Sequence, residues 1–505
     1  MNTKSRVKKP VKTPLQNAVI YYLIGIMFGL PLIFTDKYFN ITETKSIFFH
    51  IISIALIAFV VCGGSKAKNP EATRPPVGSV LKLNDLSVSD KAMAVFCGVM
   101  LISCILSQYS ECWIGLSSRY QGFYTIFIYT VIYFIISRNF TSAQGFLFFA
   151  VFAFSIVSVL GVLHCYGIDP LSLYEGIAEK YKTTFISTIG NINFYSSYMC
   201  LLMPLVVCGF CLSVGKISRT VYTAALIIGS FGMMVTSSES FVVGFGFSLL
   251  IMPLFFYSRP HRLKRFLVSI VIIVLSTQAY MLIYNLADNG NIAVSRLLKI
   301  LVNPYICTAI IVCCLLACLI VSKFPDKIKI LKIIYPVCLV IFVLTIAICF
   351  ILANTVGLPR FNGAFKITSE WGTYRGKIWR FCVKTYLYEY SFKEKLFGTG
   401  LETLHKVTAS AKLFERKSLD QAHNEYLQYL MTTGIVGLSA YLGVIASVIY
   451  TVVKKLREST LAVALLTALI AYWMQATVNI AQPFTTPIVY IYIACIAGMA
   501  RRNGR

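Results

Sequence analysis

The amino-acid sequence predicts an all-α polytopic integral membrane protein with about 12–14 transmembrane helices and one large extracytoplasmic loop. Of 505 residues, 57% are hydrophobic and only 13% are charged, whereas soluble proteins average about one quarter charged. Apolar runs of about 18 or more residues recur along the chain, and each is long enough to cross roughly 30 Å of hydrocarbon as a helix. A porin-type barrel is excluded, because its strands are short and alternate between apolar and polar residues.

The apolar runs place the whole chain, residues 1–505, in a single integral membrane domain with no internal repeat. The segment 64–91 has the proline and glycine content of a flexible connector. The predicted membrane-spanning ranges are 17–35, 46–63, 92–107, 122–137, 145–164, 193–213, 220–236, 240–257, 266–285, 305–322, 333–354, 426–453, 461–478 and 485–500.

The formal net charge of +26 indicates orientation in a membrane rather than binding to nucleic acid. If the basic N-terminus is cytoplasmic, the basic segments 258–265, 323–332, 454–457 and 501–505 fall on the same side, as the positive-inside rule requires. The first apolar run is long and lacks a clear small-residue cleavage site, so it resembles a signal anchor. We therefore expect both termini to be cytoplasmic.

Nearly all of the 16 cysteines lie within the predicted membrane-spanning ranges, where they act as small apolar packing residues. Cys313 and Cys318 have no histidine or carboxylate nearby in the sequence that could complete a metal site. The extracytoplasmic loops also lack an Asp-x-Asp or similar carboxylate cluster for a divalent cation. We expect neither a metal nor another cofactor.

Three extracytoplasmic segments, 108–122, 165–193 and 355–422, are longer than simple turns. The longest, 355–422, is rich in aromatic residues, which argues against disorder. Within it, residues 374–389 have helical periodicity, which predicts either a helix lying along the membrane surface or a loop helix packed on the ends of the membrane-spanning helices. The segment FGTG, 397–400, is expected to end this helix. The predicted apolar face consists of Ile378, Trp379, Cys382, Val383, Tyr386 and Leu387.

The polar residues His423 and Asn424 stand at the beginning of the apolar run 426–453. With Ser418 or Asp420 as the cap, both are expected in the first helical turn, where free N–H groups and the helix dipole favour an anion such as a phosphate. The same field disfavours imidazolium and should keep His423 neutral and able to accept a proton near pH 7. The alternative is a structural histidine at the membrane edge.

Arg119 and Arg375 lie on the extracytoplasmic side, where the positive-inside bias discourages charge, in the aromatic contexts SSRYQGFY and TYRGKIW. A guanidinium stays charged at any workable pH and binds phosphate through paired hydrogen bonds. The alternative role for each arginine is to anchor the chain to lipid headgroups.

Four stretches together resemble the superfamily of O-antigen ligases and Wzy-type polysaccharide polymerases. His423 and Asn424, followed by nine residues and GIVG, resemble its H[NSQ]-x9-G-x-x-G motif. GNINFYSSYMCLLMPL (190–205) resembles its Gly-Asn-x-Asn-Phe helix opening, and SSRYQGFY (117–124) its Arg-x-x-Gly helix entry. RGKIWRFCVKTYLYEYSFKEKLFGTGLETL (375–404) resembles its Arg-x3-Trp helix with a following Gly-x-Gly turn.

This resemblance implies a GT-C-like, metal-independent, inverting glycosyltransferase in the bacterial cytoplasmic (inner) membrane, with its active site on the extracytoplasmic side. The donor would be a glycan on undecaprenyl diphosphate, and the acceptor a hydroxyl of a glycan, glycolipid or protein, as in lipopolysaccharide and other cell-envelope polysaccharides. His423 and Arg375 would be catalytic, and Gly434 and Gly437 would let neighbouring helices approach closely. The residues that would bind substrate are Arg119, Asn424, Asn191, Asn193 and Trp379.

The sequence departs from this superfamily in two respects. The stretch TSSESFVVG (236–244) has Glu239 where many relatives have a cation, and the predicted helices exceed the usual dozen or so. The sequence does not separate a ligase from a Wzy-type polymerase of lipid-linked repeat units. A flippase or transporter of lipid-linked oligosaccharides is the alternative from another class, although the predicted helices contain few ionisable residues.

Overall fold

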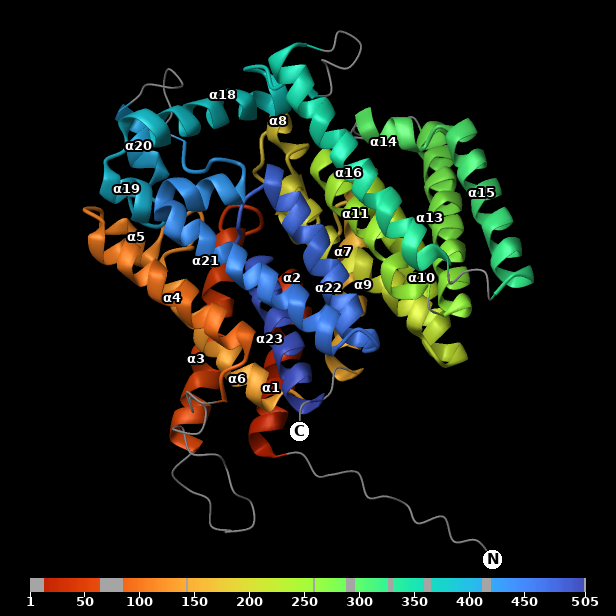
Figure 1. Ribbon diagram of the computed structural model, residues 1–505, viewed down its shortest axis with the longest axis horizontal. Coiled ribbons are helices and arrows are strands. Elements are labelled where there is room, and N and C mark those ends of the chain that lie inside the picture. The colour runs from red at the N-terminus through yellow and green to blue at the C-terminus, as the bar shows by residue number, and fades with distance from the viewer. Residues whose placement is uncertain are drawn as a thin grey trace, which may run out of the picture.

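The computed structural model describes residues 13–63, 85–141, 144–257, 259–287, 296–325, 330–357, 365–410 and 419–503. It confirms the predicted all-α polytopic membrane fold (Figure 1). Twelve helices of the described chain are long and apolar enough to cross a membrane. The described strands are β1 (Phe185–Ile186) and β2 (Gly190–Asn191), which form a short antiparallel pair.

The twelve helices coincide with twelve of the predicted apolar runs, and two shorter or more polar helices account for the rest. These two are α6 (Phe123–Asn139) and α23 (Thr486–Asn503). The long helices are α1 to α2 (Pro14–Leu32, with the π-helical turn η1), α3 (Ile41–Gly63), α4 (Val88–Leu106), α7 (Gln144–Cys165), α9 (Ile192–Leu212), α10 (Lys216–Met234), α11 to α12 (Glu239–Phe256), α13 (Pro260–Ala287), α15 (Pro304–Lys323), α16 (Leu331–Thr355), α21 (Glu425–Lys455) and α22 (Thr460–Gln475, continued by a 3-10 turn to Val478).

Helix α9 forms the centre of the bundle. Of its most apolar 18-residue window, 89% is buried, and it packs against α22, α10, α11 and α13. A helix that is apolar on all sides is typical of such a central position. Helices α15 and α16 have only 11% and 6% of the corresponding windows buried, so nearly all of their apolar surface is left for lipid.

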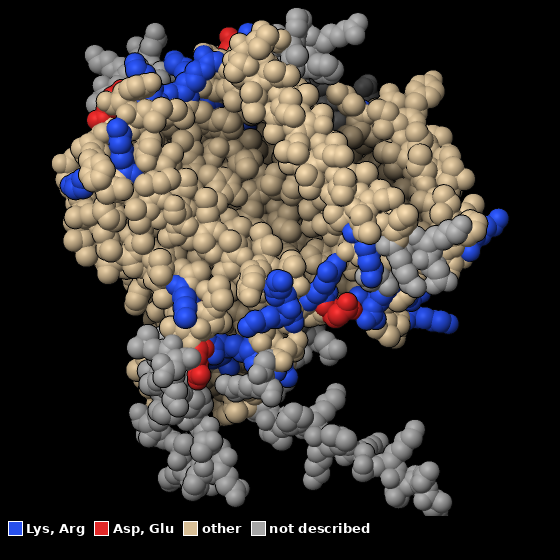
Figure 2. Space-filling model, viewed as in Figure 1, with Lys and Arg blue, Asp and Glu red and all other residues tan. Residues whose placement is uncertain are grey.

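The two ends of the bundle differ in character. Both described ends of the chain lie at one end, where many of the visible lysines and arginines also gather (Figures 1 and 2). The opposite end, here called the loop end, carries the short helices α5 (Glu111–Ile114), α8 (Glu179–Lys182), α18 (Trp371–Lys384), α19 (Phe392–Phe397) and α20 (Leu404–Ser410). This asymmetry is the one that the positive-inside rule describes.

Helix α18 occupies the segment predicted to be a loop helix, and it runs across the loop end in Figure 1. Its residues Ile378 and Cys382 are buried in a cluster with Leu404, Ala422 and Met431. This face therefore packs on the protein itself. Contact of the opposite face with a membrane surface remains a prediction.

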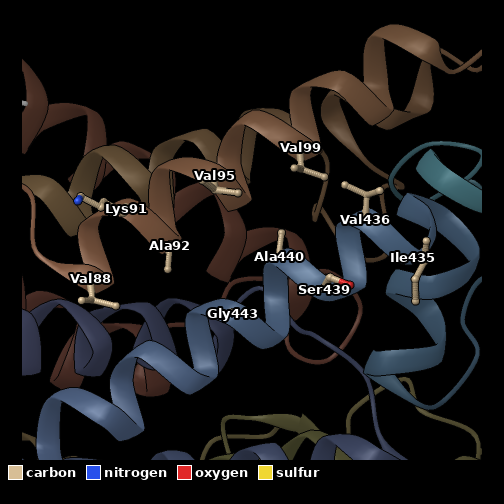
Figure 3. Close-up of a pocket in the computed structure, with 10 residues that line it drawn as sticks. All are labelled: Val88, Lys91, Ala92, Val95, Val99, Ile435, Val436, Ser439, Ala440 and Gly443. Atoms are coloured by element: carbon tan, nitrogen blue, oxygen red, sulfur yellow. The ribbon is translucent and has the colours of Figure 1, made fainter. Parts of the chain in front are cut away.

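An open groove of about 590 Å³ lies between α4 and α21 (Figure 3). Lys91 and Ser439 are the polar residues in its lining, which is otherwise apolar. Because both helices are long enough to cross the membrane, such a groove suits lipid acyl chains rather than a polar substrate. The full lining is Val88, Lys91, Ala92, Val95, Val99, Ile435, Val436, Ser439, Ala440 and Gly443.

Candidate active site

Helix α21 begins directly after His423 and Asn424, the polar residues at the start of the predicted apolar run 426–453. Asn424 is the N-cap, and its Oδ1 accepts a hydrogen bond from the backbone N–H of Leu427 at 3.0 Å. His423 precedes the cap and has a left-handed backbone with φ of 51°. The prediction that both residues lie in the first helical turn is therefore wrong, because Asn424 caps the helix itself. The other candidate cap, Ser418, lies outside the described residues.

Helix α21 is sharply bent at Gly434, where φ is 67° and ψ is −173°. This backbone conformation is essentially restricted to glycine. Tyr441 Oη donates a hydrogen bond to Glu425 Oε1 at 2.8 Å, although a straight helix would hold residues so far apart in sequence about 24 Å from each other. Residues 425–433 therefore form a short arm that folds back along the long part of the helix, 435–455.

Close backbone packing at the bend explains why positions 434 and 398 are occupied by glycine. A Cβ on Gly434 would lie 2.3 Å from the carbonyl carbon of Leu396 in α19. A Cβ on Gly398 would lie 2.1 Å from the carbonyl carbon of Thr432 in the arm. The FGTG turn thus ends α19 instead of the helix predicted at 374–389, and it presses the backbone of α19 against the arm. Gly437 instead leaves room for Thr433 of the arm.

The buried carboxylate of Glu425 fastens the arm. Tyr472 of α22 donates to its Oε2 at 3.0 Å, in addition to the bond from Tyr441. The neighbouring Tyr426 donates from its Oη to the carbonyl of Trp473 at 2.8 Å. Because a carboxylate is costly to bury without donors, these tyrosines fix the position of the residues that follow His423.

Arg375 projects from a strained opening of α18. Gly372, Thr373 and Tyr374 have positive φ values of 60°, 60° and 69°. Gly376 has no space for a side chain, since its Cβ would lie 1.9 Å from the carbonyl oxygen of Thr368. Burial lowers the pKa of Arg375, and the nearby carboxylate of Glu239 opposes this effect. Strained backbone that persists in a fold is common at functional sites.

Trp379 connects α18 to the loop that carries the histidine. Its Nε1–H donates a hydrogen bond to the carbonyl oxygen of Ala422 at 3.0 Å. Its ring packs against Trp371 at 5.2 Å between centroids. The structure therefore places Trp379 as a support of the loop before His423, and substrate binding by Trp379 stays a prediction.

Arg119 approaches from the loop between α5 and α6. Its guanidinium forms an ion pair with Asp420 at 2.9 Å and lies over the ring of Phe194, 5.7 Å from the centroid. Its Nη1 donates to the carbonyl oxygen of Ser118 at 3.2 Å, while its buried Nε has no hydrogen-bond partner among the described residues. This arginine has one ion pair and an unsatisfied donor.

His423 is partly buried and lies among these charges. Burial, followed by the positive charge of Arg375, lowers its pKa to about 4, with Arg119 acting in the same direction and Asp420 against it. The structure thus brings the three predicted residues His423, Arg375 and Arg119 into one electrostatic site at the loop end. The imidazole is neutral at pH 7, but burial is the main cause instead of the predicted helix dipole.

Asn191 and Asn193 lie at the start of α9, as predicted. Asn191 caps the helix, and its Oδ1 accepts from the backbone N–H of Asn193 at 2.9 Å. The side-chain Oδ1 of Asn193 accepts from Ser238 Oγ at 3.2 Å, next to Glu239. These contacts assign local roles to both asparagines, and only the ring of the adjacent Phe194 reaches Arg119.

The site contains two acidic residues, Asp420 and Glu402, whose role cannot be recognised in the sequence alone. The sequence pattern predicts Asp420 only as a helix cap, and Glu402 is not a defined position of any motif. Gln421 Nε2 donates to Glu402 Oε1 at 3.1 Å, and burial raises the pKa of Glu402 to about 7. The sequence does contain one signal for Asp420, its position three residues before His423. However, the sequence does not show that this loop folds onto Arg119.

A second polar group missed by the sequence lies between α22 and α23. Asn479 donates to Ser197 Oγ at 3.0 Å, and Gln475 and Gln482 also contact this hydroxyl. All of them are buried. Three amides close together near the end of an apolar run are a recognisable signal, because unpaired amides are costly inside a membrane.

Two guanidinium groups beside a neutral imidazole suit a reaction in which a phosphate-containing group is bound while a proton is removed. A search for related families finds that the model described as O-antigen ligase matches residues 305–442, a region that contains Arg375 and His423. No curated protein sequence matches the chain. The family match confirms the predicted resemblance and contains the stretches 375–404 and 423–437, whereas 117–124 and 190–205 lie outside the matched residues.

Proposed function

Since the chain resembles the O-antigen ligases and Wzy-type polymerases over residues 305–442, we propose that it is a membrane glycosyltransferase of the O-antigen ligase type. It transfers a glycan from undecaprenyl diphosphate to an acceptor hydroxyl on the extracytoplasmic side, with inversion and without a metal. The family match and the apolar helices support the broader class, a ligase- or polymerase-type membrane enzyme.

The observation that carries this proposal is that the positive charges of Arg375 and Arg119 both act on the partly buried imidazole of His423. In the proposed reaction, the acceptor oxygen attacks the anomeric carbon, and the bond between that carbon and the diphosphate oxygen breaks. The bonding electron pair leaves with the diphosphate, and the hydroxyl proton moves to His423. The arginines stabilise the charge that develops on the leaving oxygen.

The shape of the loop end supports a lipid-linked donor. Figure 2 shows a hollow in this face of the molecule, below α18 and between α21 and α16. Most of α16 is exposed apolar surface, so one wall of the hollow is suited to contact with lipid. A polyprenyl chain in the bilayer would thus reach the arginines from the side.

The first test is transfer in vitro with the purified full-length protein, a lipid-diphosphate glycan and candidate acceptors in the presence of a chelator. We expect His423→Ala to lower the rate about 10²–10⁴-fold and Arg375→Ala about 10²–10³-fold. The matched controls are His261→Ala and Arg259→Ala, at exposed positions near the start of α13, which should retain the wild-type rate.

Product analysis separates the alternatives. A product extended by a second lipid-linked repeat unit indicates a polymerase, and a glycan on a different acceptor indicates a ligase. Movement of the intact lipid across the bilayer without any transfer would indicate a flippase. Full activity of His423→Ala or Arg375→Ala would overturn the assignment of the site.

A further inference from the structure

Each arginine of the site interacts with a carboxylate. Asp420 pairs with Arg119 at 2.9 Å, and Glu239 acts on Arg375. Two cations that act on the same imidazole in a partly buried site repel each other, so the two carboxylates stabilise their arrangement. A diphosphate that binds both arginines competes with these carboxylates.

The ion pair of Arg119 is suited to exchange. The side chains of Arg119 and Asp420 are 18% and 33% exposed, so the pair lies at the edge of the site. The Nε of Arg119 has no partner among the described residues, which leaves donor capacity for a phosphate oxygen. Arginine prefers to bind phosphate through two parallel hydrogen bonds, and a diphosphate carries more charge than one carboxylate.

Hydrogen bonds hold residues 421 and 422 of the loop in place, whereas the side chain of Asp420 is partly exposed. Gln421 is bound to Glu402, and the backbone of Ala422 is held on both sides, by Gln428 Oε1 at 2.8 Å and by Trp379. The Asp420 carboxylate already acts on the imidazole of His423 while it is paired with Arg119. The residue to which it can turn is His423, three positions further along the same loop.

The charged groups that act on His423 show why a change of partner by Asp420 would assist the reaction. They are Arg375 and Arg119, which oppose its protonation, and Asp420, which favours it. Glu402 lies beyond them and interacts with Arg119 and Asp420. When His423 accepts the proton of the acceptor hydroxyl, the resulting imidazolium therefore requires a negative partner.

We propose that Asp420 is a positioning residue that exchanges partners: it pairs with Arg119 as described above, and with His423 once the donor diphosphate has bound Arg119. This proposal rests on the proposed function. Donor binding activates the site, because it frees the Asp420 carboxylate. This carboxylate then orients the imidazole of His423 and stabilises the imidazolium. The proton moves from the acceptor hydroxyl to His423.

The test compares Asp420→Asn with Glu239→Gln, since both remove a carboxylate that opposes donor binding but only Asp420 acts on His423. For Asp420→Asn we expect the Kd for undecaprenyl diphosphate to be unchanged or lower, while kcat falls at least about ten-fold. For Glu239→Gln we expect a similar or lower Kd with kcat within about two-fold of wild type. Asp420→Glu, which retains the charge, should recover part of kcat.

The outcomes distinguish failure of this proposal from failure of the proposed function. If Asp420→Asn keeps full kcat in an active protein, Asp420 is merely a counter-ion and the exchange is wrong. If its Kd rises, Asp420 supports donor binding and does not compete with it, which also overturns the proposal. If the wild-type protein transfers no glycan from any lipid diphosphate, the proposed function itself fails. Lipid binding by Asp420→Asn shows that the variant is folded.

Discussion

At the scale of single residues, the site depends on a histidine that stays neutral among cations. Burial and the two arginines lower the pKa of His423 to about 4, so its neutral form dominates above pH 5. A base of this kind loses activity only when the pH falls through its pKa. At about pH 6.5 an unperturbed histidine is half protonated, whereas His423 is almost fully neutral.

The pH dependence follows from this shift. We expect kcat/KM, which reports the free enzyme, to stay level from pH 8 to about pH 5 and to fall below that. Titration of histidine Cε1 signals by NMR provides an independent measurement, with the signal missing in His423→Asn identifying this residue among the five histidines. Arg375→Gln should raise the midpoint. A midpoint near 6.5 in the wild-type protein would contradict the electrostatic account.

At the scale of elements, the bend in α21 is the feature that brings His423 to the arginines. Hydropathy places a continuous helix at 426–453, because Gly434 stands within an apolar run and one glycine does not end such a run. The bend is produced by contacts that are distant in sequence, from Leu396 to Gly434 and from Tyr441 to Glu425. Local patterns therefore predict the helix but not its reversal.

Substitution of the bend glycine tests this account. We expect Gly434→Ala to destabilise the protein by at least about 1–3 kcal/mol, because alanine does not tolerate this backbone and its Cβ would meet α19. The matched control is Gly443→Ala in the same helix, where an added Cβ meets nothing within 4 Å. Thermal unfolding in detergent and the transfer rate measure both variants. Equal Tm values for the two would argue against a strained bend.

At the scale of the whole molecule, the sequence predicts the bundle well and the site only in part. Helix positions follow from apolar length, because lipid imposes the same requirement on every crossing. Arg119, Arg375 and His423 were predicted to meet through the family resemblance. Asp420 and Glu402 could not be assigned to the site in this way, since their partners are set by how three loops fold together.

The orientation of the bundle is a prediction for the whole molecule. We expect Ala409→Cys, at the loop end, to react with a membrane-impermeant maleimide in intact cells, and Lys455→Cys, at the far end of α21, to react only after permeabilisation. The native exposed cysteines Cys62, Cys313 and Cys338 are first replaced by alanine. Labelling in the reverse order would place the site in the cytoplasm and exclude an extracytoplasmic acceptor.

The arm of α21 also gives a meaning to the nine residues between Asn424 and Gly434. They form about two and a half turns of helix, so each inserted or deleted residue would swing the histidine by about 100° around the arm and move it by about 1.5 Å. The nine-residue spacing therefore sets the distance and the direction from the bend at Gly434 to His423. The length of the arm is therefore constrained, in addition to the side chains of Glu425 and Tyr426 that fasten it.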